Sequence, residues 1–296
     1  MSGRAIVVTG AGSGIGLEVT RDLVRRGAHV VLAVRDTARG AAVAKQLDGP
    51  GTATVMRLDL ADLDQIPDFT RELLTRHDDL SALVANAGIM GGPLRRSAQG
   101  HELQMATNHL GHAALVAGLW PLLEASHSRL VVITSGEARD GRLSPAAERK
   151  ELFDPDPYDG RHVYRNSKQA NLLFARELHR RSRATGSQVT TVAAHPGAAG
   201  TDLLARQLHR AGHPRLATLS KAVTRAILPS AQAGARSTLR ALELDTPGGA
   251  FVGPARFGQL HGPPEFLDVY DSASDLATAV RLWQLTQGAL GTTLPF

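Results

Sequence analysis

Residues 5–16 read Ala-Ile-Val-Val-Thr-Gly-Ala-Gly-Ser-Gly-Ile-Gly, a short apolar run that leads directly into a glycine-rich turn. From Ile15 to Arg26 the apolar residues recur at helical spacing, so the turn opens a helix. Backbone N–H groups and the helix dipole at such a junction face a bound phosphate, and glycine permits the sharp turn and close approach. The pattern predicts a site for the diphosphate of a dinucleotide, with a merely tight turn as the alternative.

The rest of the chain continues this alternation of apolar runs and helical patterns. Continuous apolar strands between helices indicate a parallel sheet that is covered on both faces. Because crossovers are right-handed, we expect a single-domain, Rossmann-type, doubly wound α/β fold over residues 1–296. The expected strands lie at 5–9, 30–34, 53–58, 81–85, 130–134, 189–194 and 250–252, and the expected helices at 15–26, 38–47, 63–76, 102–125, 163–183, 231–242 and 275–287.

Residues 198–230 form a segment without a strand pattern that contains glycine, proline and apolar helical pieces. The segment follows the end of a strand, which is where ligands bind in sheets of this kind. It is interpreted equally well as a substrate lid or as a plain pair of surface helices.

Composition excludes several classes of protein. The chain has no cysteine, which rules out disulfides and thiolate metal sites, and its 12 histidines form no metal-binding motif, so no metal is expected. The net charge is +5, but the arginines are scattered among acidic residues, so we expect no nucleic-acid partner. No apolar run reaches the ~18 residues of a membrane span, and a strand begins almost at once. A cytoplasmic protein without a signal peptide is expected.

The end of the second expected strand bears on the choice of nucleotide. Enzymes specific for NAD usually place an acid at the position of Val34, where it binds the ribose hydroxyls. Here the next residue is Arg35, whose guanidinium suits a 2′-phosphate, so the sequence favours NADP(H) over NAD(H). Two alternatives stay open: Asp36 reaches the ribose if the turn is shifted, or Arg35 is an ordinary solvated residue.

Tyr164 and Lys168 are four residues apart on one expected helix and therefore share a face. A phenol with a pKa near 10 is a poor acid or base at neutral pH, and a nearby ammonium lowers that pKa toward the working range. The spacing thus predicts an acid–base pair, with a structural tyrosine beside a surface lysine as the alternative.

Three ordered motifs together carry a family resemblance: TGxxxGIG at Thr9 to Gly16, NAG at Asn86 to Gly88, and YxxxK at Tyr164 to Lys168. With them, residues 4 to about 201 resemble the short-chain dehydrogenase/reductase family. The resemblance implies that a tyrosine exchanges a proton with the substrate oxygen, a serine positions the carbonyl, a lysine binds the nicotinamide ribose, and an asparagine holds a relay water. The implied catalytic residues are Asn108, Ser135, Tyr164 and Lys168.

The same resemblance implies where the cofactor is held. Three of the implied residues have alternatives. Thr134 could take the place of Ser135 if the alignment is off by one, and Asn108 could be an ordinary helix asparagine. Thr201 could be a helix N-cap. The implied cofactor-binding residues are Gly10, Ser13, Gly14, Ile15, Gly16, Arg35, Asp59, Leu60, Asn86, Ala87, Gly88, Tyr164, Lys168, Pro196, Gly197 and Thr201.

The distance between Ser135 and Tyr164 narrows the resemblance further. Tyr164 follows Ser135 by 29 residues, more than the dozen or so common in the family, and the insertion 136–163 is polar and rich in proline. Together with Asn171-Leu172-Leu173-Phe174, this looks like the retinol-dehydrogenase-like branch, whose members act on lipophilic or bulky compounds. Glu137 departs from the small or apolar residues usual there, and either adds a carboxylate at the site mouth or points into solvent.

We therefore expect an NADP(H)-dependent oxidoreductase that acts on a small-molecule carbonyl compound or alcohol. A lyase, isomerase or cyclase on the same fold, and a non-enzymatic NADP(H)-binding sensor, are the alternatives. A homo-oligomer stays open, because relatives often pair through two long helices, whereas the C-terminal extension of this chain could cover those faces.

Overall fold

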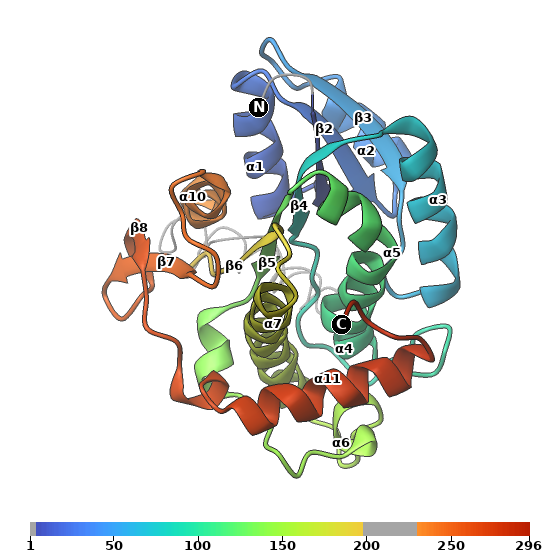
Figure 1. The fold of residues 1–296 in the computed structure, drawn as a ribbon, viewed down its shortest axis with the longest axis vertical. Helices are drawn as coiled ribbons and strands as arrows, with labels where there is room; N and C mark the ends of the chain where they lie inside the picture. The colour runs from blue at the N-terminus through green and yellow to red at the C-terminus, as the bar shows by residue number, and fades with distance from the viewer. Residues whose placement is uncertain (1–3, 198–229) are drawn as a thin grey trace, which may run out of the picture.

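The computed structural model describes residues 4–197 and 230–296. Their strands are β1 (Ala5–Thr9), β2 (His29–Val34), β3 (Thr52–Arg57), β4 (Leu80–Ala85), β5 (Arg129–Ile133), β6 (Thr190–Ala194), β7 (Phe251–Arg256) and β8 (His261–Phe266). They form one sheet in the order β3-β2-β1-β4-β5-β6-β7-β8 (Figure 1). Pairing is parallel from β3 to β7, and β8 joins antiparallel. The expected doubly wound α/β fold is confirmed.

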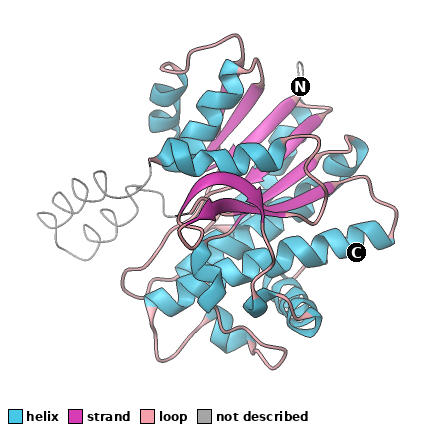
Figure 2. Ribbon diagram, turned by 90° about the vertical axis from the view of Figure 1, so that its left-hand side faces the viewer, coloured by secondary structure: helices cyan, strands magenta, loops and turns pink. Residues whose placement is uncertain are grey.

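Helices cover both faces of the twisted sheet (Figure 2). The α-helices are α1 (Gly14–Arg25), α2 (Thr37–Ala44), α3 (Ile66–Arg76), α4 (Leu103–Met105), α5 (Gly111–Ala125), α6 (Arg149–Phe153), α7 (Gly160–Ala184), α10 (Ala231–Leu242) and α11 (Leu276–Leu290). Shorter turns are η1 (Leu63–Gln65), η2 (Ala106–Leu110), η3 (Gly136–Asp140) and η4 (Asp271–Ala273).

The central strand β1 shows why the sheet is covered twice. Ile6 and Val8 point to one face and pack with side chains of α1 and α10. Ala5 and Val7 point to the other face, where α3, α5, α7 and α11 supply the core. Each valine or isoleucine buried in this way contributes roughly 1.5–3 kcal/mol, so a strand apolar at every position requires helices on both sides.

The expected helix 102–125 is in fact three consecutive segments, because the π-helical turn η2 separates α4 from α5. Gly111 packs closely against the loop after β3: a Cβ there would lie 2.3 Å from the carbonyl oxygen of Leu60. A π turn shifts the side chains around it relative to a regular helix, and such turns are frequent at functional sites. Apolar spacing does not reveal one extra residue in a turn, so the sequence predicted a regular helix.

The last expected strand, 250–252, is longer in the structure and has a partner that the sequence did not predict. β7 extends to Arg256, and β8 returns as an antiparallel edge strand. The sequence did not predict this hairpin because it contains three prolines, Pro254, Pro263 and Pro264. Proline lacks an N–H donor and therefore argues against a strand. An edge strand tolerates proline, since one of its sides needs no partner.

Two expectations lie outside the described residues: the lid at about 198–230 and the role of Thr201. Within residues 4–197 and 230–296, none of the helices combines the length and apolar character needed to cross a membrane.

Candidate active site

The carboxyl ends of the parallel strands surround a cavity of about 360 Å³. Ligands bind at this edge of doubly wound sheets because the loops there diverge to either face. All the residues expected to hold the cofactor that the structure describes line this cavity. They are Gly10, Ser13, Gly14, Ile15, Gly16, Arg35, Asp59, Leu60, Asn86, Ala87, Gly88, Tyr164, Lys168, Pro196 and Gly197.

The glycine-rich turn is held in place by the loop after β4. Gly10 and Gly14 have φ values of +68° and +58°, which residues with a Cβ rarely adopt. A Cβ at Gly16 would lie 2.5 Å from Asn86 Nδ2 and 2.7 Å from the Gly10 carbonyl oxygen. Asn86 Nδ2 donates to the carbonyl oxygen of Thr9 at 2.8 Å, which joins the two loops. The expected phosphate loop is therefore a rigid structure built against Asn86.

The N-terminus of α1 opens into the cavity next to this turn. Ser13 is the N-cap residue, but its side chain forms no capping hydrogen bond, and the first turn contains no acidic residue. The first N–H groups of a helix lack intrahelical partners and favour anions. These residues therefore fit the diphosphate of a nicotinamide dinucleotide.

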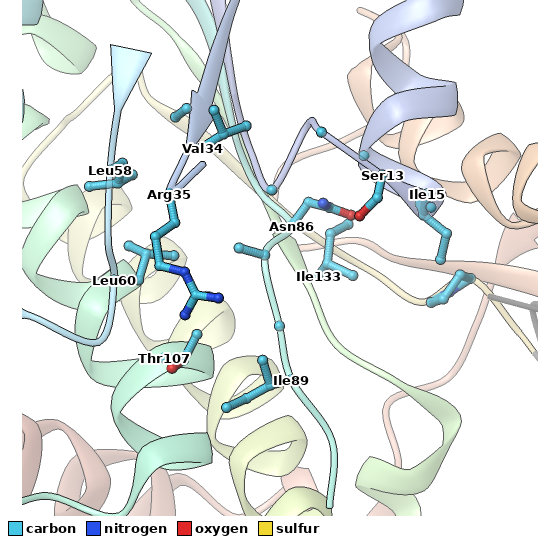
Figure 3. Close-up of a pocket in the computed structure, with 18 of the residues that line it drawn as sticks. Ser13, Ile15, Val34, Arg35, Leu58, Leu60, Asn86, Ile89, Thr107 and Ile133 are labelled. Atoms are coloured by element: carbon cyan, nitrogen blue, oxygen red, sulfur yellow. The ribbon is translucent and has the colours of Figure 1, made fainter. Parts of the chain in front are cut away.

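Two arginines lie at the opposite end, where β2 meets α2. Arg35 reaches from the end of β2 on the side of Leu58 and Leu60, while Ser13 lies across the cavity (Figure 3). Arg39, one helical turn further on, also lines the cavity. Within the described part of the chain, neither guanidinium forms an ion pair.

Asp36 has a task that the sequence did not predict. Its carboxylate accepts a hydrogen bond from the backbone N–H of Arg39 at 2.9 Å and is the N-cap of α2. In this position the carboxylate stabilises a helix terminus. Asp36 also lines the cavity, so its role at the ribose stays a prediction.

The catalytic end of the cavity is formed by α7 and the end of β5. Tyr164 and Lys168 are 7% and 4% exposed, and Lys168 Nζ lies 5.9 Å from the Tyr164 ring centroid. Lys168 Nζ donates to the carbonyl oxygen of Ile133 at 3.2 Å. The Thr134 hydroxyl donates to the Lys168 carbonyl oxygen at 2.6 Å, so it anchors α7, whereas Ser135 lines the cavity together with Tyr164 and acts to lower the pKa of Tyr164.

The pKa values of this pair differ from the expected ones. Burial raises the pKa of Tyr164 to about 12, the hydrogen bond with Ser135 opposes this, and the charge of Glu137 adds to it. Burial also lowers the pKa of Lys168 to about 8. The expected lowering of the tyrosine pKa by its lysine is thus not found, because desolvation is the largest influence on Tyr164 and raises its pKa.

Asn108 lies in η2, behind the cavity wall rather than on it. Its side chain accepts from the N–H of Ile89 at 2.8 Å and donates to the Ile89 carbonyl oxygen at 2.9 Å. It also donates to the Ser167 hydroxyl at 3.0 Å. Asn108 therefore ties the loop after β4 to α7, and its part in a proton relay stays a prediction.

Residues 4–147 match the profile of the family described as short chain dehydrogenase. Retinol dehydrogenase 14 of Mus musculus is 33% identical over 98% of this chain and 87% of its own length. Retinol dehydrogenase 11 of Homo sapiens is 38% identical over 69% of this chain, but the match spans only 64% of the human protein. A crystal structure of an uncharacterized protein from Mycobacterium paratuberculosis is 36% identical, with a TM-score of 0.79 and coverage of 100% of this chain and 96% of that one. The chain belongs to the short-chain dehydrogenase/reductase family.

Membership of the short-chain dehydrogenase/reductase family implies a nicotinamide dinucleotide cofactor and a small-molecule substrate. It does not decide between NAD(H) and NADP(H). The resemblance that the motifs carried, including the likeness to retinol dehydrogenases, is confirmed.

The structure adds site residues to this short-chain dehydrogenase/reductase that the motifs did not reveal. Arg39 was detectable, because it follows Arg35 at helical spacing after a strand end. Ile89 and Thr107 also line the cavity, but no sequence signal distinguishes them from core residues. His195 precedes the Pro196–Gly197 wall, and its Nδ1 accepts from the N–H of Gly197 at 3.1 Å.

Proposed function

We propose that this protein is an NADP(H)-dependent oxidoreductase that interconverts a carbonyl group and an alcohol on bulky, lipophilic molecules. The observation that carries the proposal is one cavity with two different ends. Arg35 and Arg39 lie at one end and form no ion pair with the residues that the structure describes, and Ser135, Tyr164 and Lys168 lie at the other end. A dinucleotide phosphorylated on its adenosine ribose matches both ends at once.

The preference for NADP(H) rests on the charges around β2. A 2′-phosphate forms charge-assisted, often bidentate hydrogen bonds with guanidinium groups. Arg35 and Arg39 are both exposed at the rim, where a phosphate can reach them without displacing another acid. Asp36, the carboxylate that would compete for the ribose hydroxyls, is engaged in capping α2.

In the proposed reaction, the nicotinamide supplies or accepts the hydride when the cofactor is bound. Tyr164 donates its phenolic proton to the carbonyl oxygen in reduction, and it accepts that proton back in oxidation. The phenol of Tyr164 is protonated at neutral pH, as the donor role requires, but its raised pKa makes it a weaker acid than an ordinary tyrosine, so the reaction needs the charge of Lys168 to favour the phenolate. Ser135, which lines the same end of the cavity, positions the substrate oxygen, and Lys168 fixes the ribose on the buried side.

The substrate class is proposed from the relatives. The matched proteins are named retinol dehydrogenases, and retinol is a lipophilic alcohol. The cavity wall shared with the nicotinamide end contains Ile89 and Ile133. Apolar side chains around a few fixed polar groups are typical of sites that bind lipophilic small molecules.

The first test is binding of NADPH and NADH to the purified protein, followed by a panel of lipophilic ketones, aldehydes and quinones. We expect tighter binding of NADPH and a fall of its absorbance in step with product. Binding of NADPH without oxidation across the panel would favour a cyclase, isomerase or sensor on this fold. Failure to bind either nucleotide would remove the basis of the proposal.

A further inference from the structure

Glu137 follows the serine of the proposed catalytic group by two positions. Its backbone N–H donates to the Ser135 hydroxyl oxygen at 3.3 Å. That bond occupies a lone pair of the serine oxygen and leaves the hydroxyl proton free to point at Tyr164 or at a substrate oxygen. The position of Glu137 therefore bears directly on the direction of the Ser135 O–H bond.

The side chain of Glu137 is neither a free carboxylate at the mouth nor one that points into solvent. Its Oε2 accepts from Arg165 Nε at 2.8 Å, and its Oε1 accepts from Arg161 at 3.3 Å. Partial burial would raise the pKa of Glu137, but the bonds to the two arginines hold it below its ordinary value. Glu137 thus stays ionised and bound to α7.

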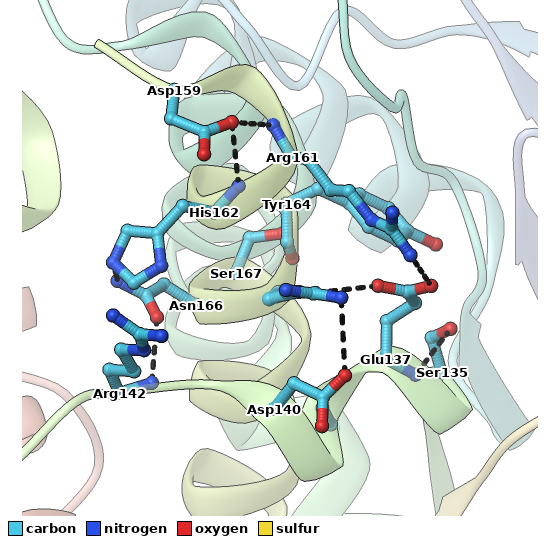
Figure 4. Close-up of polar contacts among 12 residues, drawn as sticks. Ser135, Glu137, Asp140, Arg142, Asp159, Arg161, His162, Tyr164, Asn166 and Ser167 are labelled. Atoms are coloured by element: carbon cyan, nitrogen blue, oxygen red, sulfur yellow. Dashed lines mark hydrogen bonds and ion pairs between the residues drawn. The ribbon is translucent and has the colours of Figure 1, made fainter.

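Arg165 follows Tyr164 directly and bridges the two acids of η3. Besides Glu137, it reaches Asp140 at 3.2 Å, so one guanidinium holds both ends of the turn that begins after Ser135. The Arg165 and Glu137 side chains are 25% and 34% exposed, so solvent screens this ion pair less than a fully exposed one, whereas Asp140 is 57% exposed and its pair with Arg165 is an ordinary surface pair. Figure 4 shows Tyr164 and Glu137 on the same side of α7, with Ser135 beside Glu137.

We propose that Arg165 is a positioning residue which, through Glu137 and Asp140, fixes the Ser135 hydroxyl against the Tyr164 hydroxyl and balances the charge of Glu137 beside the phenol. This inference rests on the proposed acid–base role of Tyr164. Of the charged groups in the described residues, Lys168 faces Tyr164 from its own helix and Glu137 faces it from η3. Arg165 and Arg161 offset Glu137, and Asp140 shares the Arg165 guanidinium.

The charge balance predicts opposite effects for the two partners. Arg165→Met leaves Glu137 with the more distant Arg161 alone, so its negative charge is less balanced, which disfavours phenolate and raises the apparent pKa of the catalytic group by about 0.5–1 unit. Reduction, which needs the protonated phenol, then persists to higher pH, and oxidation begins at higher pH. Glu137→Gln removes the negative charge nearest the phenol and leaves Arg165 with Asp140, so it shifts both limbs to lower pH.

The experiment measures pH profiles of kcat/KM in both directions, together with the Kd of NADPH, for Arg165→Met, Arg165→Lys and Glu137→Gln. We expect Arg165→Met to lower kcat about 10-fold with the NADPH Kd unchanged within about two-fold. Arg165→Lys keeps the charge but not the bridge to both acids, so it should restore the pH profile and only part of kcat. Arg71→Met is the matched control, because it removes an exposed i,i+3 pair with Asp68 on α3.

A second measurement does not depend on turnover. The chain has three tyrosines, so ¹³C labelling at the single ring carbon that bears the hydroxyl gives three resonances. The resonance that is missing in Tyr164→Phe belongs to Tyr164. The Tyr164 resonance should move in Arg165→Met and in Glu137→Gln and stay in place in Arg71→Met. An unmoved resonance, or pH profiles that coincide with those of the unaltered protein, would overturn the inference. An inactive unaltered protein in which the resonance still moves would instead count against the proposed function alone.

Discussion

The two ends of the cavity are prepared for their ligands in opposite ways. At the adenosine end, Arg35 and Arg39 are exposed and form no ion pair within the described residues. At the proposed catalytic end, Tyr164 and Lys168 are buried, and Lys168 already donates to the backbone of Ile133. An arginine that must stay charged and unpaired until its ligand arrives costs less free energy when it is exposed to water than when it is buried. Groups that transfer a proton act best when they are already held in position before the substrate binds.

The strongest test of this contrast is Tyr164→Phe. The substitution removes only the hydroxyl, so turnover should fall at least about 1,000-fold, because the proton donor is lost while the ring still fills its site. The Kd of NADPH should change by less than about two-fold. Single-turnover assays and nucleotide titrations measure the two quantities. Retention of most activity would assign the acid to another group.

At the adenosine end the effect should fall on affinity instead. Arg35→Ala combined with Arg39→Ala should weaken NADPH binding about 10- to 100-fold, as expected for the loss of charge-assisted hydrogen bonds, and should leave NADH binding nearly unchanged. Calorimetric titration of both nucleotides gives the ratio. Equal losses for NADPH and NADH would mean that these arginines do not recognise the 2′-phosphate.

Two buried histidines, His109 and His112, predict a pH dependence of the free energy of unfolding. Burial lowers the pKa of His109 and of His112 from 6.5 to about 4. In the unfolded chain both take up protons below about pH 6.5, but in the folded protein they do not until about pH 4. The contribution of these two histidines to the free energy of unfolding is therefore fully present above pH 6.5 and is lost as the pH falls from 6.5 to 4. Tm should drop by about 5 °C or more across this window, and His109→Phe should flatten the decline.

The smallest expected effect concerns Asp36. If its carboxylate only caps α2, Asp36→Asn keeps an acceptor for the N–H of Arg39 and should change the Kd of NADH less than two-fold. Asp36→Ala should lower the free energy of unfolding by about 1 kcal/mol through loss of the cap. A large loss of NADH affinity in Asp36→Asn would return the ribose role to this residue.

The parts of the site that the sequence predicted are those in which one local element brings the residues together. Gly10, Gly14 and Gly16 belong to one strand–turn–helix unit, and Tyr164 and Lys168 lie one helical turn apart. Such spacings translate directly into shared faces and tight turns. The β7–β8 hairpin and the π-helical η2 were not predicted, since proline at an edge and one extra residue in a turn leave no periodic signal.

By itself, the sequence determined the doubly wound fold, the phosphate loop and the family, because hydrophobic periodicity and glycine placement act over a few residues. Only the tertiary structure decided the use of Asp36 as a helix cap, the engagement of Asn108 with Ile89 and the pairing of Glu137 with Arg165. Each of these depends on where the partner side chain is brought by the packing of other elements. Burial likewise decided that the pKa of Tyr164 is raised rather than lowered, because it makes the phenolate form less stable, and burial follows from the whole fold.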